Sequence, residues 1–476
     1  MICKTVTGVK KTMVLEPEHY LVIAMFASFI ALLFTGFPVA WVLAGVGVAF
    51  AGIAWWTDGL GLTMTGLDYN SLGILTGRIF AIMDNWVLVA LPMFIFMGLM
   101  MDKSGIAERM MYSMQKMFGN VRGGLAITVT MIGIVLAAST GIIGASVVLL
   151  GVMSLPIMLK QRYHKSIALG TIAASGCLGI LIPPSIMLVI MGDQLGVSVG
   201  DLFMGAVFPG LILGLLYIAY IYIYGRLFPE NTPLAADHRE IGFQDVVQLM
   251  LDILPPGLLI LLVLGAIFAG VATVTEASGV GALGATLLAI FRRRFSYAVL
   301  KDVVINTMNT SAYIFAIFLG ATFFALVLRE CGGDDLIGAL LTGLDMGAYG
   351  LIGLVLFVIF LLGFFLDWIE ISLIVLPLLG PVVKGLELAV DGYGVVDDPN
   401  LVWFALLVAV TLQTSFLTPP VGFALFYLKG VCPPGIKLLD IYKGVVPFIL
   451  LQLIGLMLVF VFPQLVTWLP SVAYAK

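Results

Sequence analysis

Long runs of apolar residues, separated by short polar or Pro/Gly-rich stretches, follow one another along most of the chain. A run of about 20 apolar residues can cross a bilayer as a helix. The pattern predicts ten crossings, at 20–35, 38–56, 86–101, 165–192, 201–224, 254–274, 275–291, 311–328, 401–429 and 445–468. Since no segment is both long and polar enough for a soluble domain, the chain is predicted to be an all-α polytopic membrane protein.

Two further apolar stretches, 123–160 and 349–386, are too long for one crossing and carry small or polar residues in the middle. These middle parts read AASTGIIGAS and FFLDWIEIS. Loops rich in Arg and Lys favour the cytoplasmic side of a membrane, and such loops flank 123–160 at both ends. We therefore expect 123–160 to be a re-entrant hairpin, and 349–386, which ends in an acidic loop, to be a second hairpin that enters from the opposite face.

The second half of the chain repeats the order of the first. A proline pair begins at Pro183 and another at Pro419, and DLFMGAVFP is echoed by DIYKGVVP. An odd number of crossings in each half inverts the second half relative to the first. The predicted parts are an N-terminal tail (1–19), a first inverted repeat (20–227, with hairpin 123–160 and broken helix 165–192), a cytoplasmic linker (228–253), and a second inverted repeat (254–476, with hairpin 349–386 and broken helix 401–429). Inverted repeats with discontinuous helices are typical of secondary transporters.

The composition strengthens the membrane assignment and removes several function classes. Hydrophobic residues make up 61% of the chain and charged residues 11%, whereas a soluble domain carries about 25% charged residues. The chain has no basic patch for nucleic acid, its four cysteines lack metal-ligand spacing, and its three histidines are widely separated. Because no serine has a histidine within plausible reach, we expect no enzyme.

Two predicted crossings are interrupted by adjacent prolines, in GILIPPSIML and SFLTPPVGFA. Proline lacks an N–H group and leaves the carbonyl four residues earlier without its helical donor. We therefore expect free carbonyl oxygens at Gly179, Ile180, Ser415 and Phe416. Together with hydroxyl groups, such oxygens suit an alkali cation, and the half-helix that follows offers N–H groups to an anion. A break of this kind can hold a cation and an anion side by side.

The centres of the two hairpins supply further candidate ligands. In the first hairpin these are Ser139, Thr140, Gly144 and Ser146. In the second half Asp367 would face the break, with Thr411, Gln413, Thr414 and Ser415 from the broken helix nearby. Carboxylates inside a membrane are rare and usually functional, so Asp367 is predicted to bind the cation, and Trp368 and Glu370 to contact the substrate. Alternatives remain: Asp367 reaches water or headgroups, Glu370 pairs with a cation on a partner, Trp368 anchors the tip at an interface, and the prolines only kink their helices.

Four stretches carry a family resemblance: GASVVLLGVMSLPIM, GCLGILIPPSIMLVIMG, FFLDWIEISLIVLPLLGP and LQTSFLTPPVGFALFYLKG. They resemble the large membrane subunit of TRAP (tripartite ATP-independent periplasmic) transporters, from about Tyr20 to the C-terminus. The resemblance implies a bacterial inner-membrane, Na+-driven importer of organic acids with an elevator-type fold like that of the ion transporter superfamily. It also implies two partners, a small four-helix membrane subunit and a soluble periplasmic substrate-binding protein.

The resemblance extends to the candidate site. In the first half it places cation ligands in 139–146 and 176–182, so Gly176 and Ile182 join Gly179 as candidates. In the second half it places them at Asp367 and in 411–418. Ser185, Thr418 and Gly422 beside the proline pairs complete the predicted substrate contacts. LDWIEI and LQTSFLTPP resemble the branch labelled for mannitol and chloroaromatic compounds, whose relatives handle 2-oxo acids and lactate.

These observations predict a Na+-coupled secondary importer subunit. It would translocate a small organic anion (a 2-oxo acid, a lactate-like acid or a dicarboxylate) delivered by a periplasmic binding protein, with Na+ as coupling ion. Glu370 beside the substrate favours monocarboxylates. The alternative is a stand-alone cation/proton antiporter or carrier that needs no binding protein.

Overall fold

The computed structural model describes residues 16–141, 143–234, 242–344 and 346–474. Within these ranges all regular secondary structure is helical and no strand is present. The predicted all-α class is therefore confirmed.

Nine helices in the described ranges are long and apolar enough to cross a membrane. They are α2 (Val39–Gly59), the continuous pair η1–α4 (Trp86–Lys103), α7 (Ile143–Lys160), α10 (Val199–Leu227), α11 (Phe243–Phe268), α12 (Val274–Phe291), α13 (Tyr297–Glu330), α18 (Pro399–Leu417) and α20 (Leu438–Val461). The shorter elements are α1 (Pro17–Leu33), α3 (Tyr69–Asp84), α5 (Ile106–Phe118), α6 (Gly124–Thr140), α8 (Lys165–Cys177), η2 (Leu178–Ile180), α9 (Ile186–Leu195), α14 (Gly333–Thr342), α15 (Ala348–Leu362), α16 (Trp368–Glu370), the π-helical η3 (Ile371–Val375), α17 (Leu376–Lys384), α19 (Phe423–Val431) and α21 (Gln464–Tyr474). The chain is a multi-pass integral membrane protein.

Some element boundaries differ from the sequence pattern. α3 and α14 were not expected, and α11 begins at Phe243, inside the predicted linker. The stretch 445–468, expected as one crossing, contains the end of α20 and the start of α21, because Pro463 stands between them and proline has no N–H for the helix. Both broken helices are interrupted where the proline pairs predict it.

The helices pack into two units. The first contains the described residues up to Ile82, with Ala316–Leu354 and Gly385–Glu387. In it, α1 packs against α2 and α14. The rings of Phe26 and Phe29 lie with their centroids 5.7 and 5.3 Å from that of Phe324, so aromatic contacts hold α1 to the adjoining part of α13.

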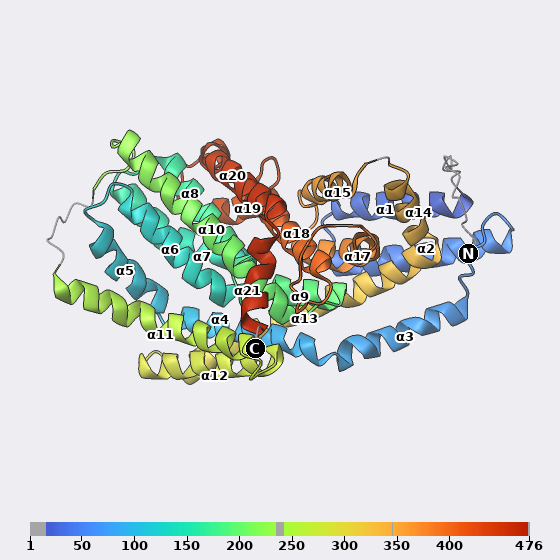
Figure 1. The fold of residues 1–476 in the computed structure, drawn as a ribbon, viewed down its shortest axis with the longest axis horizontal. Helices are drawn as coiled ribbons and strands as arrows, with labels where there is room; N and C mark the ends of the chain where they lie inside the picture. Colours follow the sequence, from blue (N-terminus) through green and yellow to red (C-terminus); the bar gives the residue numbers. More distant parts are fainter. Residues whose placement is uncertain (1–15, 142, 235–241, 345, 475–476) are drawn as a thin grey trace. The chain divides into compact units, whose positions relative to one another are not determined.

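The second unit contains Met83–Phe315, Val355–Lys384 and the residues from Leu388 onward. In it α8 packs against α6, α7 and α20 (Figure 1). A Cβ atom on Gly170 of α8 would lie 2.1 Å from the carbonyl oxygen of Gly444 on α20. Real Cβ atoms do not approach an oxygen so closely, so these two helices need glycine where they touch. The predicted first hairpin and both broken helices belong to this unit.

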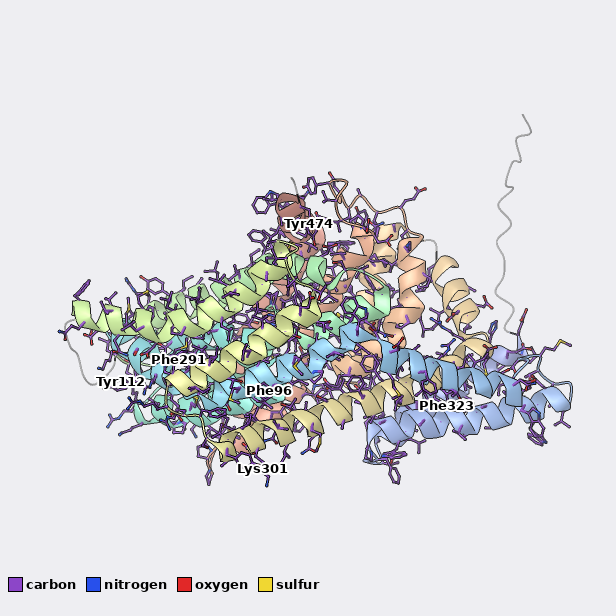
Figure 2. All side chains as sticks on the ribbon, turned by 90° about the horizontal axis from the view of Figure 1, so that it is seen from below. Phe96, Tyr112, Phe291, Lys301, Phe323 and Tyr474 are labelled. Atoms are coloured by element: carbon purple, nitrogen blue, oxygen red, sulfur yellow. The ribbon has the colours of Figure 1, made fainter. Side chains whose placement is uncertain are left out.

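Large apolar side chains project outward from the second unit. Phe291 at the end of α12 is 78% exposed and Tyr112 on α5 is 63% exposed (Figure 2). In a soluble protein an extended surface of this kind would favour aggregation. In a membrane protein such side chains face lipid or its interface, which agrees with the multi-pass assignment.

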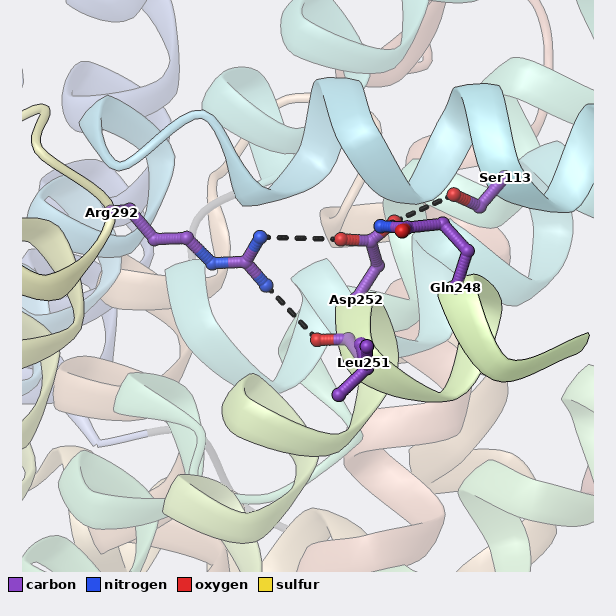
Figure 3. A network of polar contacts seen from close by, with 5 residues as sticks. All are labelled: Ser113, Gln248, Leu251, Asp252 and Arg292. Atoms are coloured by element: carbon purple, nitrogen blue, oxygen red, sulfur yellow. Dashed lines mark hydrogen bonds and ion pairs between the residues drawn. The ribbon is translucent and has the colours of Figure 1, made fainter. Parts of the chain in front are cut away.

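A buried polar network ties α5, α11 and α12 together (Figure 3). The carboxylate of Asp252 accepts hydrogen bonds from Ser113 at 2.6 Å, Gln248 at 3.1 Å and Arg292 at 3.2 Å. Arg292 also donates to the carbonyl of Leu251 at 3.0 Å. The side chains of Asp252 and Arg292 are only 2% and 17% exposed, so the charges stabilise each other out of water.

We expect Asp252→Ala to destabilise the protein strongly. Removing one partner leaves the guanidinium of Arg292 poorly compensated, and breaking a buried pair in this way costs on the order of 3 kcal/mol. The thermal midpoint of the purified protein measures this. Asp302→Ala is the matched control: its pair with Lys103 is 2.8 Å long but roughly half exposed on both sides, and an exposed pair contributes about 1 kcal/mol or less. Equal midpoints for the two variants would show that the network is not stabilising.

Candidate functional site

The first broken helix consists of α8, which ends at Cys177, and α9, which begins at Ile186. The short turn η2 follows α8 directly. The two prolines in the gap are joined by a cis peptide bond. Ser185 is the N-cap residue of α9 and is fully buried. Its hydroxyl donates a hydrogen bond to the carbonyl of Ile180. The hydroxyl of Ser185, a predicted substrate contact, therefore already donates its proton to a hydrogen bond inside the break.

The second broken helix is interrupted between Thr418 and Phe423, the first residue of α19. Thr418 makes two local hydrogen bonds: its N–H donates to the carbonyl of Ser415 at 3.0 Å, and its hydroxyl donates to that of Thr414 at 2.7 Å. Here too the proline peptide bond is cis. Gly422, the residue before α19, has φ +48°, a left-handed conformation that glycine adopts without steric cost.

Two of the four carbonyls expected to be free already have donors. Ile180 accepts from Ser185, and Ser415 accepts from Thr418, so the prediction is wrong at these two positions. The physical reason is that an unpaired carbonyl in hydrocarbon costs several kcal/mol, and nearby hydroxyls and tight turns supply donors. A carbonyl oxygen has two lone pairs, so both oxygens retain one for a cation.

The tip of the first hairpin lies against both broken helices. A Cβ on Gly141, whose φ is +58°, would lie 3.2 Å from the backbone nitrogen of Ile186. A Cβ on Gly144 would lie 3.1 Å from the ring of Tyr427 on α19. Because Gly141 and Gly144 carry no side chains, the tip can approach the first turn of α9 and the side of α19.

The remaining predicted ligands of the first half surround this contact. A Cβ on Gly176 would lie 3.0 Å from the backbone nitrogen of Val147, so the last turn of α8 touches α7 next to Ser146, which is buried. Gly179 lies in η2 and is buried. The side chain of Ile182 packs against Gly210 of α10. The side chains of Ser139 and Thr140, at the end of α6, lie outside the described part of the structure.

The carboxylates of the second half lie at the start of the helical run α16–η3–α17. Asp367 is the N-cap residue, and its Oδ1 accepts a hydrogen bond from the N–H of Trp368 at 2.8 Å. Trp368 is 4% exposed and Glu370 is 1% exposed. α16 packs against α9, which places the two carboxylates beside the half-helix that follows the first break. Because Trp368 is buried, it does not anchor the tip at a membrane interface.

The three predicted ligands on α18 differ in how their hydroxyls are used. The hydroxyl of Thr414 donates to the carbonyl of Val410, and that of Ser415 donates to the carbonyl of Phe360 on α15, both at 2.8 Å. The hydroxyl of Thr411 is buried and has no hydrogen-bond partner among the described residues. Among the three hydroxyls, that of Thr411 is the one left without a partner.

Two tyrosines near the site were missed in the sequence. Tyr313 on α13 and Tyr427 on α19 lie within electrostatic range of the carboxylates of Asp367 and Glu370, without a hydrogen bond to either among the described contacts. Tyr427 also contacts the tip of the first hairpin through Gly144. A tyrosine in an apolar helix has no distinguishing sequence pattern, so only the packing reveals these two.

A second polar cluster lies in the core of the same unit. Tyr217 of α10, Gln413 of α18 and Gln452 of α20 are fully buried, and the Tyr217 hydroxyl lies near both amides. In the described part of the protein, neither the hydroxyl nor any amide atom of this cluster has a partner in hydrogen-bond geometry. An isolated glutamine in an apolar helix, such as Gln452, is a signal that the sequence offered. The three helices α10, α18 and α20 pack against one another around this cluster.

The donor set fits a hard monovalent cation better than a transition metal. It consists of carboxylate, hydroxyl and carbonyl oxygens, which alkali and alkaline-earth cations prefer. Among the described residues no three of His, Cys, Asp and Glu are arranged to hold a metal ion. Oxygen donors of this kind suit a small hard cation, and half-helix N-termini suit an anion.

The sequence matches one protein-family model over residues 26–465, described as the tripartite ATP-independent periplasmic transporter, DctM component. The chain is 27% identical over 435 residues to the isethionate TRAP transporter permease protein DctMQ of Oleidesulfovibrio alaskensis, which covers 91% of this chain and 64% of that protein. It is 29% identical over 446 residues to the sialic acid TRAP transporter large permease protein SiaM of Vibrio cholerae, covering 93% of this chain and 97% of that protein.

A solved structure also resembles this fold. The crystal structure of the YdaH transporter of Alcanivorax borkumensis superposes with a TM-score of 0.59, covering 94% of this chain and 98% of that one, at 14% identity. At this identity the likeness concerns the fold alone.

Proposed function

We propose a function for this chain from the premise that it belongs to the family of DctM components of tripartite ATP-independent periplasmic transporters. It is therefore a large permease subunit of a TRAP transporter, and not an enzyme. We infer that it imports a small organic anion together with Na+ by an elevator movement. The family match favours this function over the stand-alone antiporter.

One observation carries the proposal of cation coupling. The carboxylates of Asp367 and Glu370 are packed beside α9, next to a helix break, and no described Lys, Arg or His forms an ion pair with either of them. A buried carboxylate without a counter-charge is costly. A coupling cation that binds there would remove this cost and would leave again on the other side of the membrane.

The substrate class follows from the relatives and from the site. The two relatives carry isethionate and sialic acid in their names, and both compounds are organic anions. In this chain, anion contacts are available at the starts of α9 and α19, close to Ser185, Thr418 and Gly422. We propose a 2-oxo acid, a lactate-like acid or a dicarboxylate as substrate, and a position in the branch resembling the mannitol, chloroaromatic and 2-oxo acid type.

The proposed partners are a small four-helix membrane subunit and a periplasmic substrate-binding protein, in the inner membrane of a bacterium. The tripartite family description supports this assembly. The match to the DctMQ relative covers 64% of that protein.

The ion dependence of uptake tests the proposal. The permease, its small subunit and its binding protein are reconstituted in liposomes, and uptake of the anion found bound to the binding protein is measured. Replacing external Na+ by K+ should lower the initial rate several-fold, because K+ is too large for a site formed around Na+. An equal rate in both buffers would contradict Na+ coupling.

A further inference from the structure

Three consecutive arginines follow the last residue of α12. Arg292 turns inward and pairs with the buried carboxylate of Asp252 (Figure 3). Arg293 and Arg294 are both exposed, and neither forms an ion pair within the described ranges of the chain. The first arginine therefore holds the segment against the protein, and the next two present unpaired positive charge at the surface.

The backbone gives these two side chains a defined position. The N–H groups of Arg294 and Phe295 donate to the carbonyl of Ala289, at 3.0 and 3.2 Å, and close the last turn of α12. Arg293 has φ +57°, the left-handed conformation that commonly ends a helix. Because this turn is hydrogen-bonded and anchored, Arg293 and Arg294 project together from a fixed point of the fold.

The start of α5 lies against the same turn. A Cβ on Gly105 would lie 3.7 Å from Nε of Arg294 and 3.8 Å from Oε2 of Glu108. Lys103, at the end of α4, pairs with Asp302 in the first turns of α13 at 2.8 Å. The end of α4, the start of α5, the end of α12 and the start of α13 therefore meet at one corner of the second unit.

Positive charge is in excess at this corner. Asp252 and Asp302 already have cationic partners, so the carboxylates left beside the corner are those of Asp102 and Glu108. Against them stand four exposed cations without an ion pair in the part of the chain that the structure describes, which we call the basic corner: Arg109, Arg293, Arg294 and Lys301.

Exposed aromatic rings flank the basic corner. Phe291, directly before the three arginines, is 78% exposed, and Tyr297, shortly after them, is 80% exposed. Tyr112 on α5 also projects outward (Figure 2). Aromatic side chains gather at the level of the lipid headgroups, and Lys and Arg side chains near helix ends reach the same level. The rings therefore place the basic corner at headgroup depth.

We propose that the basic corner binds the phosphate group of an anionic phospholipid from the cytoplasmic leaflet. Loops rich in Arg and Lys favour that side, and its membrane surface is negatively charged. The guanidinium groups of Arg293 and Arg294 donate to the phosphate oxygens, while Phe291 and Tyr297 contact the acyl chains. This site goes beyond the proposed function, because it involves neither the coupling cation nor the transported anion.

Lipid binding to the purified full-length permease tests the site. Phosphatidylglycerol, which is anionic, is titrated in detergent, and the bound lipid is measured by native mass spectrometry, with zwitterionic phosphatidylcholine as the reference. Arg293→Gln/Arg294→Gln should weaken binding of phosphatidylglycerol about tenfold or more, since each basic residue at the membrane surface adds to the attraction for anionic lipid. Its thermal midpoint without lipid should equal that of the wild type, because both side chains are exposed.

The matched control removes two positive charges from another helix end. Lys160 ends α7, and both Lys160 and Arg162 are exposed. Arg162 has φ +62°, so it shares the backbone conformation of Arg293. The aromatic residue beside it, Tyr163, is 4% exposed and cannot contact a lipid in the same way. Lys160→Gln/Arg162→Gln should bind phosphatidylglycerol as the wild type does.

Four results would overturn the lipid site. An equal loss of binding in both double variants shows that the lipid responds to total charge. Equal affinity of the wild type for phosphatidylglycerol and phosphatidylcholine shows that no anionic headgroup is selected. Displacement of phosphatidylglycerol by inorganic phosphate at the same concentration identifies a soluble anion as the occupant. If Arg293→Gln/Arg294→Gln binds lipid normally but no longer copurifies with the small subunit, the basic corner is a subunit contact.

Discussion

Asp367→Asn is expected to raise the Na+ concentration for half-maximal uptake about tenfold or more, which corresponds to at least about 1.4 kcal/mol of binding free energy. Asparagine keeps the size of the side chain and can still accept the hydrogen bond from the N–H of Trp368. The change therefore removes charge and little else. The carboxylate raises cation affinity by the same factor by which the cation stabilises the carboxylate.

Initial rates of uptake by the complete transporter, measured over a series of Na+ concentrations, give the result. Asp302→Asn makes the same chemical exchange at a roughly half-exposed carboxylate paired with Lys103, and its Na+ response should match that of the wild type. Protein amount and assembly with the small subunit should be normal in both variants. If Asp367→Asn transports with an unchanged Na+ response, Asp367 is not a ligand.

The same experiment links Asp367 to Glu370. If both carboxylates hold one ion, the effects of Asp367→Asn and Glu370→Gln on Na+ affinity should not add in the double variant, since residues of one network are coupled. Additive effects would place the two carboxylates in different sites.

The sequence was most informative where covalent geometry decides the structure. The proline pairs predicted both helix breaks, because a proline cannot donate a backbone hydrogen bond wherever it lies in the fold. The apolar runs likewise predicted most of the long helices. α3 and α14 were missed because neither combines the length and the apolar character of a crossing.

The state of the carbonyls at the breaks could not be predicted in the same way. Whether Ile180 and Ser415 are free depends on the rotamer of Ser185 and on one turn at Thr418. The residue types at these positions permit such hydrogen bonds but do not determine whether they form. The sequence indicated where oxygen ligands gather, and the structure shows which of them already have hydrogen-bond donors.

Contacts between distant segments were the least predictable part. Tyr427 lies against the first hairpin, 283 positions earlier in the chain at Gly144, and beside the carboxylates of the second hairpin. Tyr313 on α13 lies within electrostatic range of the same carboxylates. Such neighbours depend on how whole helices pack. A single sequence carries a hydrophobic pattern for each helix, but it carries no signal for which helices pack together.

The dependence on a binding protein should have the largest effect of all. In the proposed system a separate periplasmic protein captures the anion and delivers it, so the permease and its small subunit alone lack the step that brings substrate to the site. Omitting the binding protein should lower uptake to the level of empty liposomes, even with a full Na+ gradient. Adding it back should restore the rate in a saturable manner.

The most direct test of the account is therefore one uptake measurement in liposomes that contain the permease and its small subunit. An inward Na+ gradient is imposed, and the initial rate for the anion that copurifies with the binding protein is recorded with and without that protein outside. The account predicts uptake only when the binding protein and the Na+ gradient are both present. Robust, saturable uptake without the binding protein would contradict it and would identify the chain as a self-sufficient carrier or antiporter.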